Sequence, residues 1–323
     1  MNPGPRRRDQ FWPPIFLGLA LLGVIIFVEA CRPRPAGRGG AAGDVAALGD
    51  ARLTIEFLDV GQGDAALIRT PEGKTALIDA GPSPERAAQL LEERGVTRLD
   101  LAVVSHHHAD HYGGMRAVVE RFRPRAFLDA PAPHSSRAYA ALLRAVRDSG
   151  ATAIEPTPGA PRQVKLGPVL LTLLPQPPVD AREENNNSIG IRVDYGDFAA
   201  LLTGDSEVPE RAYWREHCPD LLAHVNVLKL AHHGSRNGTD AAWLKLARPE
   251  LAVASLGAGN EYGHPHPETL RRLAAAGVPL DRTDRQGTIT VATDGEGWAA
   301  HAERGDGATP ARVAARGLAG ARP

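Results

Sequence analysis

Alternating apolar and polar positions mark the start of the folded part of this chain. Residues 53–57 alternate with the period of a half-buried β-strand. Residues 65–69 and 75–79 flank the turn residues Pro71-Glu72-Gly73, and this arrangement predicts a hairpin. Ser83, as the N-cap, and Pro84, at the first helical position, then begin a predicted helix over residues 83–95. The pattern therefore indicates a sheet that is assembled from a hairpin and followed by a helix.

Further apolar runs alternate with helical patterns along the rest of the chain. Strands are predicted at 101–104, 126–128, 169–174, 225–231, 251–256 and 288–292, helices at 115–122 and 136–149, and a second hairpin at 189–193 and 198–202. Hairpins interleaved with helices in two similar halves predict a four-layer αβ/βα sandwich over residues 51–300, which is an α/β fold. Residues 288–292 are expected to close the sheet. The tail, residues 301–323, is rich in Gly, Ala and Arg, and we expect it to be disordered.

The N-terminal segment has a different character. Arg6-Arg7-Arg8 precede the apolar residues 15–28, and Val28-Glu29-Ala30-Cys31 is a partial lipobox. Residues 1–31 are therefore interpreted as a lipoprotein signal, an uncleaved membrane anchor, or a simple secretion signal. The positive flank predicts that the N-terminus stays inside, so that the folded body is exported and tethered on the outer side of the cytoplasmic membrane. Residues 32–50 are typical of a flexible linker.

Composition narrows the class of protein. Hydrophobic residues make up 43% of the 323-residue chain and charged residues 23%, which is typical of a globular protein with a sizeable core. The formal net charge of -1 gives no overall basic field for a polyanion. The two cysteines, Cys31 and Cys218, imply no disulfide framework.

A histidine-rich motif follows the predicted strand at 101–104. Read by alternate positions, residues 106–111 are H-x-H-x-D-H. Imidazole and carboxylate groups bind zinc or manganese, and such a run can send His106 and His108 to one metal and Asp110 and His111 to a second. The alternation turns His107 away from this face. A surface histidine tract is the other interpretation.

Other predicted strands also end in Asp or His beside small residues. The endings are Asp79-Ala80-Gly81, Gly204-Asp205 and His232-His233-Gly234-Ser235. One such ending would be weak evidence, because Asp is common in turns. Together with the histidine motif, these endings predict one sheet edge that collects metal ligands.

The chain resembles the metallo-β-lactamase superfamily, and within it the ComEC-like competence hydrolase domain. The resemblance rests on motifs at residues 57–64, 77–81, 105–114, 185–188, 202–205, 228–235 and 262–265. The motifs run in family order over most of the chain. The multi-helix membrane channel of ComEC proteins is missing from this sequence.

The resemblance implies a centre of two divalent metals, with zinc favoured and manganese possible. The implied ligands are His106, His108, Asp110, His111, Asp205, His232 and His233. Asp205 would bridge the two ions, and Asp79 would orient a ligand histidine. One ring of the pair His232 and His233 would be a ligand, and the other could act on the leaving group. The candidate catalytic residues are Asp110, His232, His233 and His264.

The chain departs from the wider superfamily before Asp205. A ligand histidine is usual there, but this sequence has Asn185-Asn186-Asn187-Ser188. Because an amide is a poor zinc ligand, either the first site is weakly held or it prefers manganese. The Asn run could also be a plain turn.

Three further residues are candidates for supporting or substrate-binding roles. Gly61-Gln62-Gly63-Asp64 is either a plain tight turn or a functional loop, in which Asp64 supports the metal loop or the glycines admit the substrate backbone. Lys229 either contacts a phosphate or only extends to solvent. His264, between Gly263 and Pro265, is expected to contact substrate.

The resemblance implies an exported metal-dependent phosphodiesterase that acts on DNA through metal-activated water. The alternatives are an esterase for an envelope polymer or small phosphodiester, and a non-catalytic envelope binding module. The membrane would be reached through the N-terminus, and no protein partner is evident.

Overall fold

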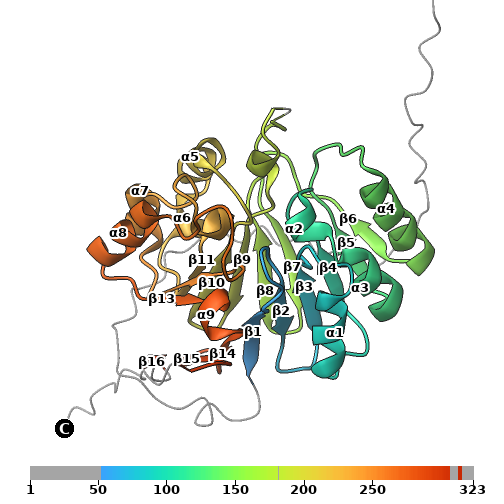
Figure 1. Ribbon diagram of the computed structural model, residues 1–323, viewed down its shortest axis with the longest axis horizontal. Coiled ribbons are helices and arrows are strands. Elements are labelled where there is room, and N and C mark those ends of the chain that lie inside the picture. Colours follow the sequence, from blue (N-terminus) through green and yellow to red (C-terminus); the bar gives the residue numbers. More distant parts are fainter. Residues whose placement is uncertain (1–51, 181, 306–311, 315–323) are drawn as a thin grey trace, which may run out of the picture. The chain divides into compact units, whose positions relative to one another are not determined.

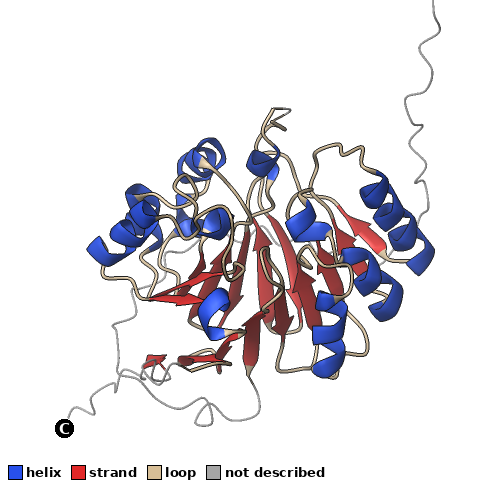
Figure 2. Cartoon of the chain, viewed as in Figure 1, coloured by secondary structure: helices blue, strands red, loops and turns tan. Residues whose placement is uncertain are grey.

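Two mixed β-sheets with helices on their outer faces form the folded body. The computed structural model describes residues 52–180, 182–305 and 312–314. Figure 1 shows the two sheets in the centre, with α1, α3 and α4 beside one sheet and α5, α7 and α8 beside the other. Figure 2 shows the same layers by type of secondary structure. The predicted four-layer αβ/βα sandwich is confirmed.

The first sheet combines the N-terminal strands with the last strands of the chain. Its order is β16-β15-β14-β1-β2-β3-β4-β5-β6. The bounds are β1 Leu53–Phe57, β2 Ala66–Arg69, β3 Thr75–Ile78, β4 Leu101–Val103, β5 Ala126–Leu128, β6 Thr152–Ile154, β14 Ile289–Thr293, β15 Trp298–Ala302 and β16 Arg312–Ala314. Strand β14 lies antiparallel to β1, with Leu53 opposite Thr293. The chain thus returns at its C-terminal end to complete the sheet with which it began.

The second sheet is built from the middle of the chain. Its order is β13-β12-β11-β10-β9-β8-β7. The bounds are β7 Arg162–Leu166, β8 Val169–Leu173, β9 Ile191–Tyr195, β10 Phe198–Leu202, β11 Val227–Lys229, β12 Leu251–Ala254 and β13 Leu280–Arg282. Strands β10, β11 and β12 run parallel, as do β3, β4 and β5 in the first sheet. Both sets therefore present the carboxyl ends of neighbouring strands at a sheet edge, which is where ligands bind in open α/β sheets.

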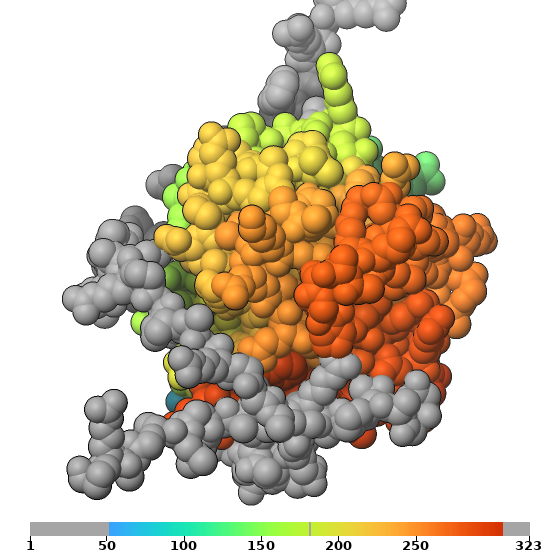
Figure 3. Space-filling view, turned by 90° about the vertical axis from the view of Figure 1, so that its left-hand side faces the viewer, coloured from blue at the N-terminus to red at the C-terminus, as the bar shows by residue number. Residues whose placement is uncertain are grey.

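The side chains of each strand enter two different cores because they alternate along the strand. In β3, Ala76 and Ile78 join a core that includes residues of both sheets, whereas Leu77 packs with the helices on the outer face. The outer helices of the first sheet are α1 Arg86–Glu93, α3 Met115–Phe122 and α4 Arg137–Ser149. Those of the second are α5 Val208–His217, α6 Pro219–Leu222, α7 Ala241–Ala247 and α8 Pro267–Ala275. Figure 3 shows a face of the molecule that is formed mainly by residues from the second half of the chain.

Local capping explains where some helices begin. The Ser136 hydroxyl accepts a hydrogen bond from the Tyr139 amide at the start of α4, and Gly150, with φ of 77°, ends the helix. The helix predicted over 83–95 is shorter than expected. The Ser83 hydroxyl accepts from the Arg86 amide at 3.3 Å, but it does so within a turn, and α1 begins only at Arg86.

The C-terminal part of the first sheet corrects the sequence prediction. Strand β14 does not close the sheet, because β15 pairs with its free edge and β16 pairs with β15. His301 and Ala302, which we expected in the disordered tail, belong to β15. The edge strand β6 was missed because its side chains are largely exposed and show no alternation.

Predictions for the remaining segments concern residues outside the described ranges. The signal, lipobox or anchor over 1–31 and the linker over 32–50 are among them, as are residues 306–311 and 315–323 of the tail. Within the ranges that are described, none of the helices has the length and apolar character needed to cross a bilayer.

Candidate metal centre

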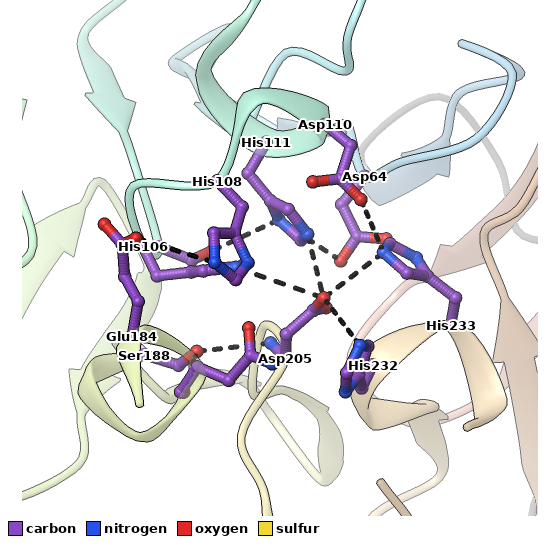
Figure 4. Close-up of polar contacts among 12 residues, drawn as sticks. Asp64, His106, His108, Asp110, His111, Glu184, Ser188, Asp205, His232 and His233 are labelled. Atoms are coloured by element: carbon purple, nitrogen blue, oxygen red, sulfur yellow. Dashed lines mark hydrogen bonds and ion pairs between the residues drawn. The ribbon is translucent and has the colours of Figure 1, made fainter. Parts of the chain in front are cut away.

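The centre lies at the sheet edge where strands of both halves end. Asp79 follows β3, Ser105 lies just beyond β4, and Asp205 lies just beyond β10. The short helices α2 (Ala109–Tyr112) and η3 (Ala231–Gly234) carry most of the remaining ligand candidates. Figure 4 shows the rings of His106, His111, His232 and His233 around the Asp205 carboxylate.

Four imidazoles converge on the Asp205 carboxylate. Their Nε2 atoms lie 3.2 Å (His111), 3.3 Å (His233), 3.8 Å (His232) and 4.0 Å (His106) from its oxygens. The Asp205 side chain is buried, and its backbone amide donates to the Ser188 hydroxyl at 3.2 Å. The predicted central position of Asp205 is therefore where the structure places it.

The proton positions on His106 follow from its neighbours. The Ser105 hydroxyl donates to Asp79 at 2.7 Å, so its oxygen is left to accept from Nδ1 of His106 at 3.2 Å. The Nε2 atom of His106 then carries a lone pair. That atom is buried, has no hydrogen-bond partner and faces Asp205.

His111 and His233 are held in the same way. Nδ1 of His111 donates to Asp79 at 2.8 Å, and Nδ1 of His233 donates to the Ser255 carbonyl at 2.9 Å. Each ring thus turns Nε2 toward Asp205. Orientation of a ligand histidine by a carboxylate or carbonyl on its other nitrogen is characteristic of metal sites.

The rings of the His232 and His233 pair both face Asp205 but differ in burial. Both residues have left-handed φ values, 49° and 53°, which are uncommon for residues other than glycine and cluster at functional sites. His233 is buried, and its Nε2 lies 3.2 Å from Asp110 as well as close to Asp205. The ring of His232 stays partly exposed, with Nδ1 3.2 Å from Glu207.

Burial and mutual charge shift the pKa values of these groups. Burial lowers the pKa of His106 well below its ordinary value, which keeps its ring neutral. Burial would also lower the pKa of His111, but the Asp205 and Asp79 carboxylates outweigh it and raise the pKa well above the ordinary value. Burial would raise the pKa of Asp205, but the charges of His233 and His111 bring it well below the usual range.

These residues fit a divalent cation. Nε2 of His111 and Oδ1 of Asp205 lie 3.2 Å apart, yet neither has a hydrogen-bond partner. Buried polar atoms without partners are costly unless something satisfies them. Ligand atoms of Asp64, His111, Asp205 and His233 all lie within 4.8 Å of one another. A mixed imidazole and carboxylate set of this kind suits zinc and related transition metals.

One side of the centre is open to solvent. The side chains of His108 and Asp110 are 39% and 30% exposed, in contrast to the buried His106 and His111. Nε2 of His108 lies 3.5 Å from Glu184 rather than beside Asp205. His108 therefore borders the centre next to His106, with the two ring centroids 4.8 Å apart.

Asp64 and Lys229 lie beneath the centre. The Lys229 ammonium forms an ion pair with Asp64, and both side chains are buried. The Lys229 side chain therefore does not extend to solvent, and its ammonium group is directed at Asp64. Asp64 lies 3.3 Å from Nδ1 of His233, and its amide donates to the Asp110 carbonyl at 3.2 Å. Gly63 packs so closely that a Cβ would lie 2.1 Å from the same carbonyl, so this turn supports the metal loop.

The Asn185–Ser188 run forms the short helix η2 (Glu184–Asn187) and its end. The Asn185 amide donates to Glu207 at 3.2 Å, while its Oδ1 is buried without a partner. Asn187 holds the preceding loop through the Asp180 backbone. The run is thus a turn that also anchors Asp205 through Ser188.

His264 stands at the edge of the same site. Its ring centroid lies 5.6 Å from that of His232 and 6.4 Å from that of His233. Burial and the neighbouring His232 lower the pKa of His264 to about 4. Tyr262 stacks on His264 and is 68% exposed, which makes it the most exposed large hydrophobic side chain in the part of the chain that the structure describes.

Three residues that contact the candidate ligand side chains were not predicted from the sequence. Ser105 links Asp79 to His106, Glu184 contacts His108, and Glu207 joins Asn185 to His232. Ser105 directly precedes the histidine motif, and Glu184 and Glu207 lie within two residues of Asn185 and Asp205. Acidic residues at such positions are common in loops, so the sequence alone carried no specific signal for them.

Comparison with known proteins agrees with this geometry. A family model described as the metallo-beta-lactamase superfamily matches residues 58–258. ComE operon protein 3 of Bacillus subtilis is 28% identical over 267 residues, which cover 73% of this chain and 32% of that protein. Competence protein ComA of Neisseria gonorrhoeae is 30% identical over 239 residues, covering 73% and 31% respectively. The chain therefore spans about a third of the length of these relatives.

Solved structures show the same fold. A CmlA beta-hydroxylase mutant superposes with a TM-score of 0.51 at 16% identity, covering 74% of this chain and 53% of that one. The metallo-beta-lactamase fold protein YhfI of Bacillus subtilis gives a TM-score of 0.50 at 12% identity, covering 71% and 96%.

Proposed function

Because the chain belongs to the metallo-beta-lactamase superfamily, we propose that its Asp205 centre hydrolyses phosphodiester bonds and that DNA is its substrate. The observation that carries the proposal is the convergence of four imidazole Nε2 atoms on one buried carboxylate. Two divalent ions held there, with zinc the first candidate, would lower the pKa of water and neutralise charge that develops on phosphoryl oxygens.

The side chains around the centre are either buried or exposed to solvent, and the two kinds have different roles in the proposed reaction. His106, His111 and His233 present Nε2 from fixed ring orientations, so they hold the ions. Asp110 and His108 lie on the open side, where substrate would enter. Burial would raise the pKa of Asp110, but His233 and His111 lower it to about 2, so its carboxylate is charged at neutral pH.

The leaving oxygen requires a proton, and His232 is placed to provide it. Its ring is partly exposed, and its Nδ1 atom lies 3.2 Å from Glu207. His264 is neutral at pH 7 because its pKa is about 4, so it acts as a hydrogen-bond acceptor or base beside His232.

DNA as the substrate is supported by two observations. A relative from Haemophilus influenzae, 28% identical over 244 residues, is named Recombination protein 2, and recombination is a reaction of DNA. The exposed ring of Tyr262 next to His264 offers a surface on which a base can stack. The net charge of -1 would instead suit a small diester or an envelope polymer, which is the competing substrate class.

Metal analysis and turnover of bis-p-nitrophenyl phosphate by the purified chain test the proposed reaction. Binding of single-stranded DNA by Asp205→Asn protein across a salt series then separates the substrates. A groove that engages several phosphates should lose roughly 0.7 log units of affinity per log unit of salt for each phosphate. Turnover of small diesters without DNA binding at low salt would reject DNA and support the competing class.

We also propose that the chain is exported and tethered to the outer side of the cytoplasmic membrane. The support is the basic and apolar N-terminal sequence with Cys31 at its end. Cys31→Ser should abolish lipid labelling and release the protein. Membrane retention of that variant without lipid labelling of either form would instead indicate an uncleaved anchor.

A further inference from the structure

A second cluster of potential metal ligands lies beside the centre, on the opposite side of the histidine motif. It contains His107, His134 and Glu184, whose ligand atoms all lie within 4.8 Å of one another. The proposed hydrolytic function does not use His107 or His134. His107 was expected to face away from the Asp205 centre, and its contacts are with a different set of residues.

The proton position on the His107 ring follows from its two neighbours. The Tyr139 hydroxyl donates its proton to Asp129, so the Tyr139 oxygen is left as an acceptor. Burial, with the charge of Asp129, raises the pKa of Tyr139, so the phenol keeps its proton. Nε2 of His107 lies 2.8 Å from the Tyr139 oxygen and 3.0 Å from Asp129. Because both partners accept, Nε2 carries the proton.

The other nitrogen of His107 then has a lone pair and no partner. Nδ1 is buried within a side chain that is 1% exposed, and it has no hydrogen bond. It faces Oε1 of Glu184 at 3.7 Å, which is too long for a hydrogen bond. A lone pair that faces a carboxylate across such a gap is unfavourable unless a positive charge lies between them.

Glu184 and His134 complete the cluster. Nδ1 of His134 lies 3.0 Å from the same Oε1 atom, and its side chain is 21% exposed. Nδ1 atoms of two imidazoles thus lie 3.0 and 3.7 Å from one carboxylate oxygen. Ligands of a tetrahedral zinc ion with bonds of about 2.0–2.1 Å are separated by comparable distances. Asp129 holds His107 as a carboxylate holds a zinc-ligand histidine.

We propose that His107, His134 and Glu184 form an accessory site for a zinc-type divalent cation, separate from the Asp205 centre. Binding displaces the proton that His134 shares with Glu184, since metal ligands must be deprotonated. Glu184 also connects the two sites. Its Oε2 atom lies 3.5 Å from Nε2 of His108, and Figure 4 shows the two side chains beside each other. An ion in the accessory site therefore fixes the carboxylate against which His108 is oriented.

Zinc stoichiometry of the full-length chain tests the proposal without reference to activity. Wild-type protein equilibrated with zinc should hold one equivalent more than His134→Ala protein. His301→Ala, which removes an exposed imidazole from β15, is the matched control and should bind as much zinc as wild type. Asp205→Asn should lose metal from the main centre but keep the equivalent that His134→Ala removes, so failure of one site is distinguishable from failure of the other.

Anomalous diffraction from wild-type crystals grown with zinc provides a second measurement that no substitution can confound. The expected result is a peak between His107, His134 and Glu184. Glu184→Gln, which keeps the shape of the side chain, should remove that peak. Equal zinc content in wild type and His134→Ala, or the absence of a peak at this position, would overturn the proposal and leave the cluster as a hydrogen-bonded relay.

Discussion

Asp79 accepts the Nδ1 proton of His111 at 2.8 Å and thereby turns the other nitrogen of that ring toward Asp205. The same carboxylate accepts from the amide and hydroxyl of Ser105, each at 2.7 Å. One buried side chain after β3 thus orients both His111 and, through Ser105, His106.

Asp79→Asn should weaken metal binding while preserving the fold. Asn tolerates the left-handed φ of 60° at this position, and it keeps the size of the side chain. An amide, however, accepts fewer hydrogen bonds than a carboxylate, so His111 and Ser105 lose part of their orientation. We expect metal affinity to fall by about 10- to 100-fold, measured by competition with a chelator. An unchanged affinity would exclude the orienting role.

Asp205→Asn should have the larger effect, because Asp205 is the group that all four imidazoles face. Loss of its charge removes the carboxylate available to both ions, so metal content should decrease and turnover should fall by at least about 100-fold. Metal analysis and turnover of bis-p-nitrophenyl phosphate measure the two effects. Full activity with unchanged metal content would refute the bridging position.

His264→Ala should impair turnover but leave metal content unchanged, since the ring borders the centre without contacting Asp205 closely. A positioned acid or base contributes about 10²- to 10⁴-fold. The pKa of about 4 means that the ring gains its proton only when the pH falls toward 4. The His264-dependent part of the rate should therefore persist from pH 7 to about pH 5 and decline below that. pH–rate profiles of the wild type and the variant measure this pH dependence. Metal loss in the variant would contradict the placement of His264 outside the metal ligands.

Tyr262→Ala should lower the affinity for single-stranded DNA without changing turnover of a small diester. Stacking of one base is worth about 1–3 kcal/mol, so the expected loss is about 5- to 150-fold. Tyr213→Ala is the matched control, because Tyr213 also stacks on an imidazole, that of His217, within helix α5. Equal losses in the two variants would show that Tyr262 is not a DNA contact.

Cys218 should be unreactive in the folded protein. Burial raises the pKa of its thiol to about 12, so the thiolate is scarce at pH 8. In Cys31→Ser protein, thiol reagents should react only after unfolding, when the pKa returns to about 8.5. The unfolded chain releases this proton at lower pH than the folded one. The free energy of unfolding should therefore decrease as the pH rises from about 8.5 toward 12. Rapid labelling of native protein would contradict the burial.

The elements whose signals are local could be predicted from the sequence. The hairpin around Pro71-Glu72-Gly73 formed as predicted between β2 and β3, because turn residues and alternation act within a few positions. The H-x-H-x-D-H spacing and the Asp or His endings of strands likewise predicted a metal site at a sheet edge. Within each sheet, parallel neighbouring strands bring such endings to one edge.

The relationships between distant segments depend on how the folded chain packs. The ring of His233 is buried and that of His232 is partly exposed, and no sequence pattern distinguishes the two rings. Lys229 became buried against Asp64, a residue 165 positions earlier. Strand β14 pairs with β1 on one side. It does not close the sheet, because β15 pairs with its other side. Each outcome depends on which partner fills the space beside a side chain or strand, and that is fixed only when the two halves pack together.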